Sequence, residues 1–426
     1  MSRIAPQPWM QEPPTRALLD ALAQAGIAAR FVGGVVRDAL LGRPIADIDL
    51  ATPARPEEVS EALAKAGIKV VPTGIEHGTV TAVVNSGVNS PGPPRHYEIT
   101  TLRRDVETFG RRARVAFDAD WAADAARRDF TINAIYLDPD GTLHNPVGGL
   151  ADLAAHRVRF VGDPTTRIAE DVLRVLRYYR FTARFGDGPG HDRGDPAARA
   201  ACRTAAALLS TLSAERVAGE LMRLLAVPDP LAALRMMDED RVLAAILPEA
   251  TRRDRLEKLV ALEPKPDPVR RLAALVAVDA NGATVMAERL RLSNAERDRL
   301  IGLAPPWPLD PTGDARVQRQ ALYRLGTERC RDLALLAAAE GNMDQGRLGE
   351  MLAFAAASPV PHFPLAGRDV TALGIPPGVR VGQLLAAVRQ WWEEGDFAAD
   401  RAACLEKLER IAGAGSETLS APAPKG

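Results

Sequence analysis

The chain has 426 residues, of which 46% are apolar and 26% charged, and its formal net charge is −1 at pH 7. A chain of this length and composition can bury sizeable cores in about two to four domains. The near-neutral charge excludes binding of a nucleic acid through one global positive field, so such a partner must be held by local basic patches. Three cysteines, odd in number and far apart, argue against a disulfide framework or a zinc cluster.

The N-terminal segment lacks a charged-then-apolar signal pattern, and no apolar run approaches the roughly 20 residues that span a bilayer. We therefore expect a cytoplasmic protein with no membrane partner. The sequence leaves its oligomeric state open.

The first 150 residues alternate between helical and β-like patterns. Residues 12–26 are alanine-rich and predict a helix, and short apolar segments predict strands at 29–32, 48–51, 79–84 and 96–101. A segment rich in Gly, Pro, Asn and Ser predicts a loop tip at 85–94. From residue 152 onward the pattern is almost wholly helical, with prolines at the helix boundaries. We expect an α+β fold: a mixed α/β head with an antiparallel-type sheet, followed by all-helical domains.

A glycine pair, Gly33 and Gly34, follows the apolar run that ends at Val32. Residues 35–41 then have an amphipathic helical pattern, which places the glycines at a strand-to-helix junction. Backbone amides at such a junction can face a phosphate group, and Arg37, one turn later, would add a fixed charge. A plain tight turn is the alternative, because the G-x-G-x-x-G pattern of dinucleotide-binding proteins is absent.

Two aspartates, Asp47 and Asp49, come shortly afterwards. In an extended strand residues i and i+2 project from the same face, so these carboxylates would converge while Ile48 and Leu50 enter the core. Adjacent carboxylates repel unless a divalent cation neutralises them, and hard oxygen ligands suit Mg²⁺. An exposed turn with two solvated acids is the alternative. The nearby glycine–arginine element favours a metal-dependent nucleotide site.

Four motifs together carry a resemblance to a known family. They are GGVVRDALLGRPIADIDLAT at 33–52, RRDFTINA at 127–134, EDVLRVLRYYRF at 170–181 and LSAERVAGELMRLL at 212–225. Their order and spacing resemble those of the class II tRNA nucleotidyltransferases, the CCA-adding enzymes, and of the bacterial poly(A) polymerases. Both groups belong to the polymerase-β-like nucleotidyltransferase superfamily. The resemblance covers about the first 225 residues.

The resemblance implies template-independent addition of C, C and A to the 3′ end of tRNA, with CTP and ATP as substrates and pyrophosphate as product. An RNA 3′-hydroxyl would attack the α-phosphate with the help of Mg²⁺ held by Asp47 and Asp49. Three alternatives stay open: addition of only CC or only A, a bacterial poly(A) polymerase, and a noncatalytic RNA-binding relative.

The family's domain order can be laid onto the chain. It implies a nucleotidyltransferase head at 1–150, a helical neck that recognises the nucleotide base at 151–226, an RNA-binding helical body at 227–357 and a helical tail at 358–412. The small and polar composition of 413–426 predicts a disordered end.

The second motif follows an arginine-rich segment at 103–114, which in the family is a flexible loop involved in switching nucleotide specificity. Two elements of this segment, ETFG and RRAR, depart from the family's pattern, so a solvated arginine face and a substrate contact both stay open. By resemblance, Arg128 contacts the nucleotide, and Asp129 and Asn133 support its ribose. Asp129 would otherwise cap the following helix. Glu98, on the strand before the loop, is a candidate third carboxylate.

In the third motif, Asp171 and Arg174 are three residues apart on a predicted helix and would share a face. An aspartate that accepts from an exocyclic amino group, beside an arginine that donates to a ring nitrogen, fits cytosine and adenine and rejects uracil and guanine. Unpaired buried groups make such rejection worth on the order of a few kcal/mol. Arg177 continues the stripe toward the triphosphate or base, and Arg180 is a further nucleotide-binding candidate. A surface ion pair is the alternative.

Beyond residue 225 the signals are weaker. Residues 364–385 resemble the family's tail, and clustered basic residues are candidates for RNA phosphate contacts: Arg252, Arg253, Arg255, Lys258, Arg270 and Arg271. Trp391 and Trp392 are expected to pack in the tail core rather than to stack on bases. His191 and Asp192 lack partner ligands, which argues against a metal-dependent phosphohydrolase site.

Overall fold

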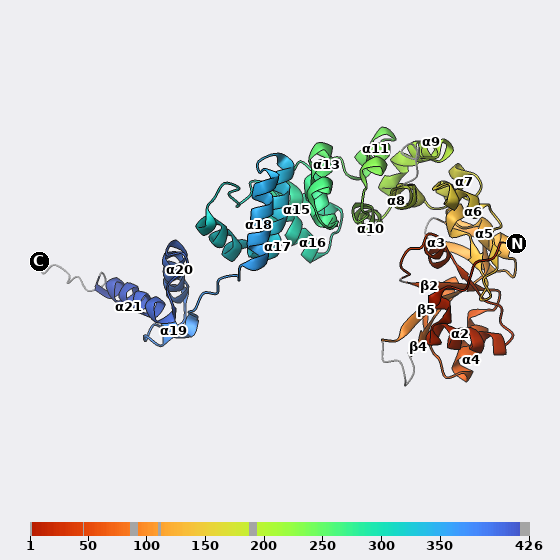
Figure 1. Ribbon diagram of the computed structural model, residues 1–426, viewed down its shortest axis with the longest axis horizontal. Coiled ribbons are helices and arrows are strands. Elements are labelled where there is room, and N and C mark those ends of the chain that lie inside the picture. The colour runs from red at the N-terminus through yellow and green to blue at the C-terminus, as the bar shows by residue number, and fades with distance from the viewer. Residues whose placement is uncertain (1, 46, 86–92, 110–111, 187–193, 418–426) are drawn as a thin grey trace, which may run out of the picture. The chain divides into compact units, whose positions relative to one another are not determined.

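The computed structural model describes residues 2–45, 47–85, 93–109, 112–186 and 194–417. The chain divides into two compact units, the first made of Met1–Ala250 with Arg289–Leu292 and the second of Thr251–Glu288 with Ser293–Gly426 (Figure 1). A mixed α/β head comes first and the remainder is mostly helical, so the predicted fold class is confirmed. The domain boundaries at 150, 226 and 357 stay a prediction.

A seven-stranded sheet forms the head, in the order β3-β4-β5-β2-β1-β8-β9. Its strands are β1 (Arg30–Val32), β2 (Ile48–Thr52), β3 (Lys69–Gly74), β4 (Thr79–Val84), β5 (Arg95–Thr101), β8 (Tyr136–Leu137) and β9 (Leu143–His144). Neighbouring strands are antiparallel except β2 and β5, which run parallel. The four strands expected from the sequence are confirmed. The edge strand β3 was missed because Pro72 and Gly74 interrupt its apolar pattern.

The two faces of the sheet have different roles. Helices α2 (Pro13–Gln24) and α4 (Pro56–Lys65) lie side by side near β4 (Figure 1). Along β2, Ile48 and Leu50 are buried and Asp49 between them is half-buried. This alternation directs the acidic side chain away from the core face. The smaller helices of the head are α1 (Pro8–Gln11), α3 (Gly34–Leu40), α5 (Trp121–Ala126) and α6 (Gly149–Ala154), with 3₁₀ turns η1 (Ile75–His77) and η2 (Thr131–Asn133).

The arginine-rich segment is a β-hairpin rather than an irregular loop. Its strands are β6 (Arg103–Phe109) and β7 (Arg112–Phe117), which pair antiparallel as a separate sheet. Val, Thr and Phe between the arginines favour these strands. The ring of Phe117 lies so close to Gly78 that a Cβ there would come within 2.8 Å of it, which fixes the base of the hairpin against the main sheet. The loop tip predicted at 85–94 lies largely outside the described residues.

Helices complete the first unit. They are α7 (Pro164–Glu170), α8 (Arg174–Phe185), α9 (Pro196–Ala205), η4 (Ala206–Thr211), α10 (Ala214–Leu225), α11 (Leu231–Glu239) and α12 (Val242–Ile246). Helix α8 packs against α10 and α11. Its buried Tyr179 donates a hydrogen bond to Asp240, which also accepts from Arg199 and Arg203. The motifs of the neck are therefore held on helices with a buried polar anchor. His191 and Asp192 lie outside the described residues.

All the secondary-structure elements in the described part of the second unit are helices. Its elements are α13 (Arg253–Leu262), α14 (Pro268–Leu275), α15 (Ala280–Arg289), α16 (Asn294–Leu303), α17 (Ala315–Glu340), α18 (Gln345–Ala357), α19 (Gly367–Thr371), α20 (Val379–Glu394) and α21 (Arg401–Glu417). Helix α17 bends at Gly326, whose φ of 77° favours glycine. Helix α21 is described as far as Glu417, and the disorder predicted for 413–426 stays a prediction.

The last three helices enclose a small core of their own. Its buried members are Phe363, Leu365, Val370, Leu384, Val388, Trp392, Cys404 and Leu408. The indole of Trp392 donates to the carbonyl of Ala399 at 2.9 Å, and Trp391 packs against the same core. The prediction that both tryptophans serve packing is confirmed.

Most of the arginines expected to contact RNA in this unit are occupied within the protein. Arg270 pairs with Glu263 at 2.5 Å and with Asp332 at 2.8 Å, and Arg271 also pairs with Glu263. Arg255 donates to the carbonyls of Ala273, Ala274 and Val276. All three arginines are buried, so the predicted phosphate contacts are wrong for them.

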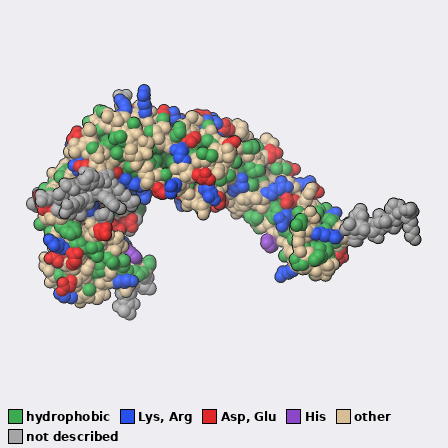
Figure 2. Space-filling model, turned by 180° about the vertical axis from the view of Figure 1, so that it is seen from behind, with side chains coloured by type: hydrophobic (Ala, Val, Ile, Leu, Met, Phe, Trp, Pro, Cys, Tyr) green, Lys and Arg blue, Asp and Glu red, His purple; other side chains and the backbone are tan. Residues whose placement is uncertain are grey.

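The surface carries charges of both signs. On the face drawn in Figure 2, Lys and Arg side chains form small groups among Asp and Glu, as the net charge of −1 leads one to expect. The three cysteines are free and buried. Within the described ranges, no helix is long and apolar enough to cross a membrane.

Candidate active site

The glycine pair forms the turn between β1 and α3. Gly33 is the residue before the helix and has φ 72° and ψ −123°, a conformation that L side chains rarely adopt. A Cβ on Gly33 would lie 3.7 Å from Nη1 of Arg128. The turn predicted from sequence is therefore placed directly beside the arginine of the second motif.

Arg37 lies one turn into α3 and is buried. Its guanidinium donates to Asp38 at 2.9 Å and to the side-chain oxygen of Asn133 at 2.6 Å, and it stacks on the ring of Phe185. Burial lowers the pKa of Arg37, and Asp38 partly opposes that effect. The charge is thus fixed in place by the protein, and a direct phosphate contact stays a prediction.

The acidic residues lie on adjoining parts of β2 and β5. Asp49 is in β2 directly opposite Glu98 of β5, and Asp47 immediately precedes β2 and is exposed. Burial, followed by the nearby carboxylates of Glu98 and then Asp47, raises the pKa of Asp49 to about 6, while Arg128 acts in the opposite direction. Two other acidic side chains therefore act on Asp49, as is expected where carboxylates gather to bind a cation.

These side chains do not form a complete metal site in this structure. In the part of the chain that the structure describes, no three His, Cys, Asp or Glu side chains are close enough together to hold a metal ion. The donor set nevertheless fits a hard divalent cation, because all three groups offer carboxylate oxygen and their mutual repulsion disfavours the fully ionised, metal-free state.

Arg128 joins the glycine turn to the acidic residues. Its Nε and Nη2 donate to Asp124 at 3.0 and 2.9 Å, and Asp124 also accepts from Arg127 and from the hydroxyl of Tyr136. Burial alone would lower the pKa of Arg128, but Asp124 outweighs it and holds the pKa above its usual value. Arg128 is consequently a permanent positive charge in a fixed position.

Asp129 faces the helices of the neck. Its carboxylate accepts from Arg177 at 2.5 Å, from Asn133 at 3.0 Å and from the backbone amide of Phe130 at 2.9 Å. Burial would raise the pKa of Asp129, but these donors outweigh it and hold the pKa below its usual value. The alternative of a helix cap is wrong, since the following 3₁₀ turn has Phe130 as its N-cap residue.

The third motif is not one continuous helix. Helix α7 ends at Glu170, Asp171 has an extended backbone with φ −153°, and α8 begins at Arg174. The Asp171 carboxylate accepts from the backbone amide of Leu173, and this local bond competes with helix formation. The prediction that Asp171 and Arg174 share a helix face is wrong for that reason.

Asp171 and Arg174 each pair with a different residue. Asp171 accepts from Arg216 of α10 at 2.7 Å, whereas Arg174 donates to Glu170 at 2.5 Å and to the carbonyl of Arg167. The simple Asp171–Arg174 ion pair is therefore not the arrangement found. The two residues remain one turn apart, since the amide of Arg174 donates to the carbonyl of Asp171.

Arg177 and Arg180 belong to the same helix and reach two different acids. Arg177 bonds Asp129 of the head, and Arg180 donates to Glu220 of α10 at 2.5 Å. Glu220 is only 2% exposed and also accepts from Arg223 at 3.1 Å. One buried carboxylate thus holds arginines of two helices.

Comparison with known proteins adds independent observations. Residues 29–159 match the family described as "Poly A polymerase head domain", and residues 195–253 match "Probable RNA and SrmB- binding site of polymerase A". The mitochondrial CCA tRNA nucleotidyltransferase 1 of Mus musculus is 32% identical over 410 residues, which cover 93% of this chain and 89% of the relative. The CCA-adding enzyme of Lacticaseibacillus paracasei is 34% identical, and the match covers 88% of this chain and 90% of that enzyme.

The chain belongs to the CCA-adding enzyme family. A solved structure agrees: the crystal structure of Bacillus stearothermophilus CCA-adding enzyme in complex with CTP has a TM-score of 0.76 at 28% identity, covering 97% of this chain and 100% of that one. The likeness therefore reaches well beyond the first 225 residues on which the sequence motifs rest. As a member of this family the chain is a nucleotidyltransferase.

Two acids that position the family's arginines were missed from sequence. Asp124 precedes Arg127 and Arg128 by three and four residues, a spacing at which a helix brings side chains together. Glu220 is a single acid on the buried face of an amphipathic helix. A buried acid at such a position is a detectable signal, because burying an unpaired carboxylate is costly.

Proposed function

We propose that this member of the family adds C, C and A to the 3′ end of tRNA without a template, using CTP and ATP and releasing pyrophosphate. The main support is that relatives named for this activity match along about nine tenths of the chain, including its second unit. Mg²⁺ as the cation and the cytoplasm as the location are parts of the same proposal.

The second candidate is a poly(A) polymerase that adds only A. The two matching family models carry that name, and they cover residues 29–159 and 195–253. The relatives that match over the body and tail as well are CCA-adding enzymes. The full-length likeness therefore favours the first candidate.

In the proposed reaction the glycine turn and Arg128 bind the triphosphate. Backbone amides after Gly33 would donate to phosphate oxygens, and Arg128, held by Asp124, would neutralise negative charge on them. Asp47 and Asp49, with Glu98 beside them, would hold divalent cations, which lower the pKa of the RNA 3′-hydroxyl and stabilise the charge that develops at the α-phosphate. Attack forms a new phosphodiester bond and releases pyrophosphate.

Base choice in this proposal rests on Asp171 and Arg174. The carboxylate would accept from the N4 amino group of cytosine or the N6 group of adenine, and the guanidinium would donate to the neighbouring ring nitrogen. Uracil and guanine place a carbonyl where the amino group should be, so both partners would be left unpaired. Asp171 and Arg174 must then exchange their present partners, Arg216 and Glu170, for the base.

Incubation of the purified protein with tRNA lacking its last three nucleotides tests the proposal. CTP alone should give two additions, CTP with ATP should give three and then stop, and a chelator should abolish both until Mg²⁺ is restored. Open-ended addition of A would identify the poly(A) polymerase instead. Absence of any product with Mg²⁺ or Mn²⁺ would identify a noncatalytic RNA-binding relative and would overturn the proposal.

A further inference from the structure

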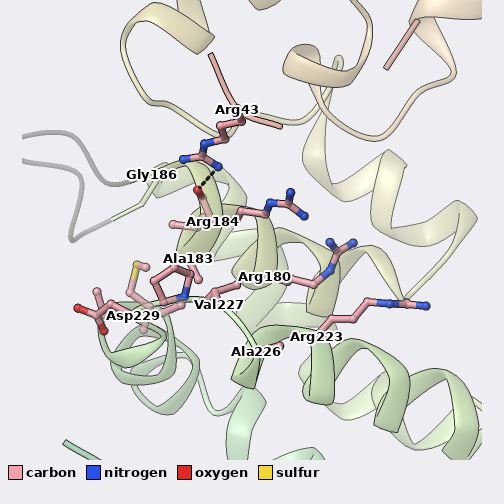
Figure 3. A pocket seen from close by; sticks show the side chains of 14 residues that line it. Arg43, Arg180, Ala183, Arg184, Gly186, Arg223, Ala226, Val227 and Asp229 are labelled. Carbon is pink, nitrogen blue, oxygen red and sulfur yellow. Dashed lines mark hydrogen bonds between the residues drawn. The ribbon is translucent and has the colours of Figure 1, made fainter. Parts of the chain in front are cut away.

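A cavity of about 710 Å³ lies in the first unit, beside the last two turns of α8 (Figure 3). Its walls come from the end of α8, the end of α10, the turn at 226–229, α11 and one residue of the head, Arg43. We call this space the arginine cavity. The nucleotide-binding candidates do not account for it, since of these only Arg180 lines it.

Four arginines line the arginine cavity: Arg43, Arg180, Arg184 and Arg223. In Figure 3, Arg180, Arg184 and Arg223 extend toward the same side, whereas the acid of the lining, Asp229, lies on the opposite side. The side chains of Arg184 and Arg223 are 46% and 67% exposed. This edge of the cavity therefore offers accessible guanidinium groups in a row.

The carboxylates near this row are shared among several arginines. Glu220 serves Arg180 and Arg223 and lies 3.9 Å from Arg177, and Asp38 is 2.9 Å from Arg37 and 3.6 Å from Arg184. The surroundings consequently hold more guanidinium than carboxylate charge, and an anionic ligand would balance the difference.

The remaining wall is apolar and offers no side-chain group for hydrogen bonds with the edge of a base. Val227, Pro228 and Met236 contribute to it. The polar groups of the lining are engaged locally: the hydroxyl of Thr182 donates to the carbonyl of Tyr178, and Asp229 accepts from the amide of Leu231. Such a wall can contact a sugar or a base face without selecting the base, as in single-stranded nucleic-acid sites.

We propose that the arginine cavity binds one nucleotide of the RNA strand a few positions before its 3′ end, with the backbone phosphates on Arg184 and Arg223. The assignment rests on the proposed function. It adds a sequence-independent RNA subsite that is separate from the triphosphate site.

The dimensions favour a strand over a free nucleotide. Arg180 and Arg184 are four residues apart on α8, so a rise of 1.5 Å per residue separates them by about 6 Å along the helix. Such a row can serve successive phosphates of one strand. Arg43, which donates to the carbonyl of Arg184 at 2.9 Å, precedes Asp47 by four residues, and so short a segment spans at most about 14 Å. The cavity is therefore close enough to Asp47 for one RNA strand to contact both.

The proposal can be tested by measuring how tightly the protein binds 3′-truncated tRNA at several salt concentrations. This measurement does not depend on catalytic activity. Fluorescence anisotropy of the full chain would compare wild type, Arg184→Ala, Arg223→Ala and the control Arg235→Ala, which removes an exposed arginine of α11 outside the lining. Each cavity variant should weaken binding about three- to tenfold and reduce the slope of log K against log salt by about 0.7–0.9. The control should match wild type.

A variant that keeps every charge tests the apolar wall. Ala183 is half-buried and lines the cavity, so Ala183→Leu should fill part of it and weaken tRNA binding, while thermal unfolding and the Kd for CTP stay unchanged. Weakened CTP binding with intact tRNA binding would instead identify a free-nucleotide site and overturn the proposal. Unchanged tRNA affinity and salt slope in all cavity variants would also overturn it.

These readouts separate the two proposals. A wild-type protein that binds tRNA but adds no nucleotide contradicts the proposed function alone. A wild-type protein that adds CCA but whose cavity variants bind tRNA normally contradicts the subsite alone.

Discussion

Arginine–carboxylate pairs occur in both units, but their exposure to solvent differs. In the second unit, Glu263 bridges Arg270 and Arg271 in a setting where all three side chains are at most 5% exposed. In the first unit, Glu220 is equally buried, yet Arg177 and Arg223 keep part of their guanidinium surface open. The pairs of the second unit therefore stabilise the fold. Those of the first unit hold arginines in place while part of each side chain stays accessible to a ligand.

The largest effect is expected at the acidic residues of the first unit. Asp49→Asn should reduce nucleotide addition at least about 10³-fold, because the cation loses a carboxylate ligand. Stability to urea should be unchanged or slightly higher, since the substitution removes repulsion from Glu98 and Asp47. The exposed Asp20→Asn serves as the control. Near-normal incorporation by Asp49→Asn would exclude the metal assignment.

Glu263→Gln tests whether the buried ion pairs of the second unit stabilise the fold. The change removes the buried carboxylate that Arg270 and Arg271 share, although Arg270 keeps Asp332. It should lower the free energy of unfolding by about 3–5 kcal/mol, measured by urea denaturation. Activity per folded molecule should stay normal. Glu257→Gln, on the exposed side of α13, should change neither quantity. A selective loss of activity in Glu263→Gln would mean that the second unit's pairs also serve catalysis.

Asp171→Asn should alter base choice rather than folding. An amide offers a donor to the carbonyl of uracil, so the preference for CTP over UTP in kcat/KM should fall about 10- to 100-fold. Arg216→Gln is the matched control, because it frees Asp171 without removing its carboxylate. If Asp171→Asn kept the wild-type preference, base recognition would have to lie elsewhere.

Glu220→Gln makes the same change in the first unit that Glu263→Gln makes in the second: a buried carboxylate shared by two arginines becomes an amide. Loss of the buried charge should loosen Arg180 and Arg223 and lower kcat/KM for nucleotide addition about tenfold, with less destabilisation than Glu263→Gln. Steady-state kinetics and urea denaturation of the two variants would be compared directly. Equal activity in both would show that Glu220 has only a structural role.

The smallest effect is expected for Arg252→Ala. Arg252 is partly exposed and pairs with Glu340 at 2.7 Å, so its removal should cost about 1 kcal/mol or less. The Kd for tRNA should change less than twofold. A loss of affinity beyond fivefold would identify Arg252 as an RNA contact and weaken the contrast between the units.

The sequence predicted the parts of the fold that follow from local periodicity. Strands β1, β2, β4 and β5 and the turn at Gly33 correspond to apolar runs and to a glycine with positive φ. The break at Asp171 was not predictable in this way, because the helical pattern continues through it and a single side-chain bond to Leu173 decides the outcome.

Burial of charged residues was the other failure. Arg255, Arg270 and Arg271 have the spacing of solvated helix residues. Their acidic partners lie on other elements: Glu340 and Asp332 are distant in sequence, and Glu263 lies in the turn before α14. The local sequence pattern does not show which charged residues are exposed to solvent, because tertiary packing determines their burial.

The parallel pairing of β2 with β5 fixes the spacing of Asp49 and Glu98. Glu98 is fixed by ladder hydrogen bonds on both sides, opposite Asp49 in β2 and opposite Thr81 in β4. The spacing of the two acids therefore depends on backbone pairing and not on the length of the connection between Val84 and Arg95. Insertions or deletions in that connection should leave the carboxylate geometry intact, so relatives can vary there without losing their chemistry.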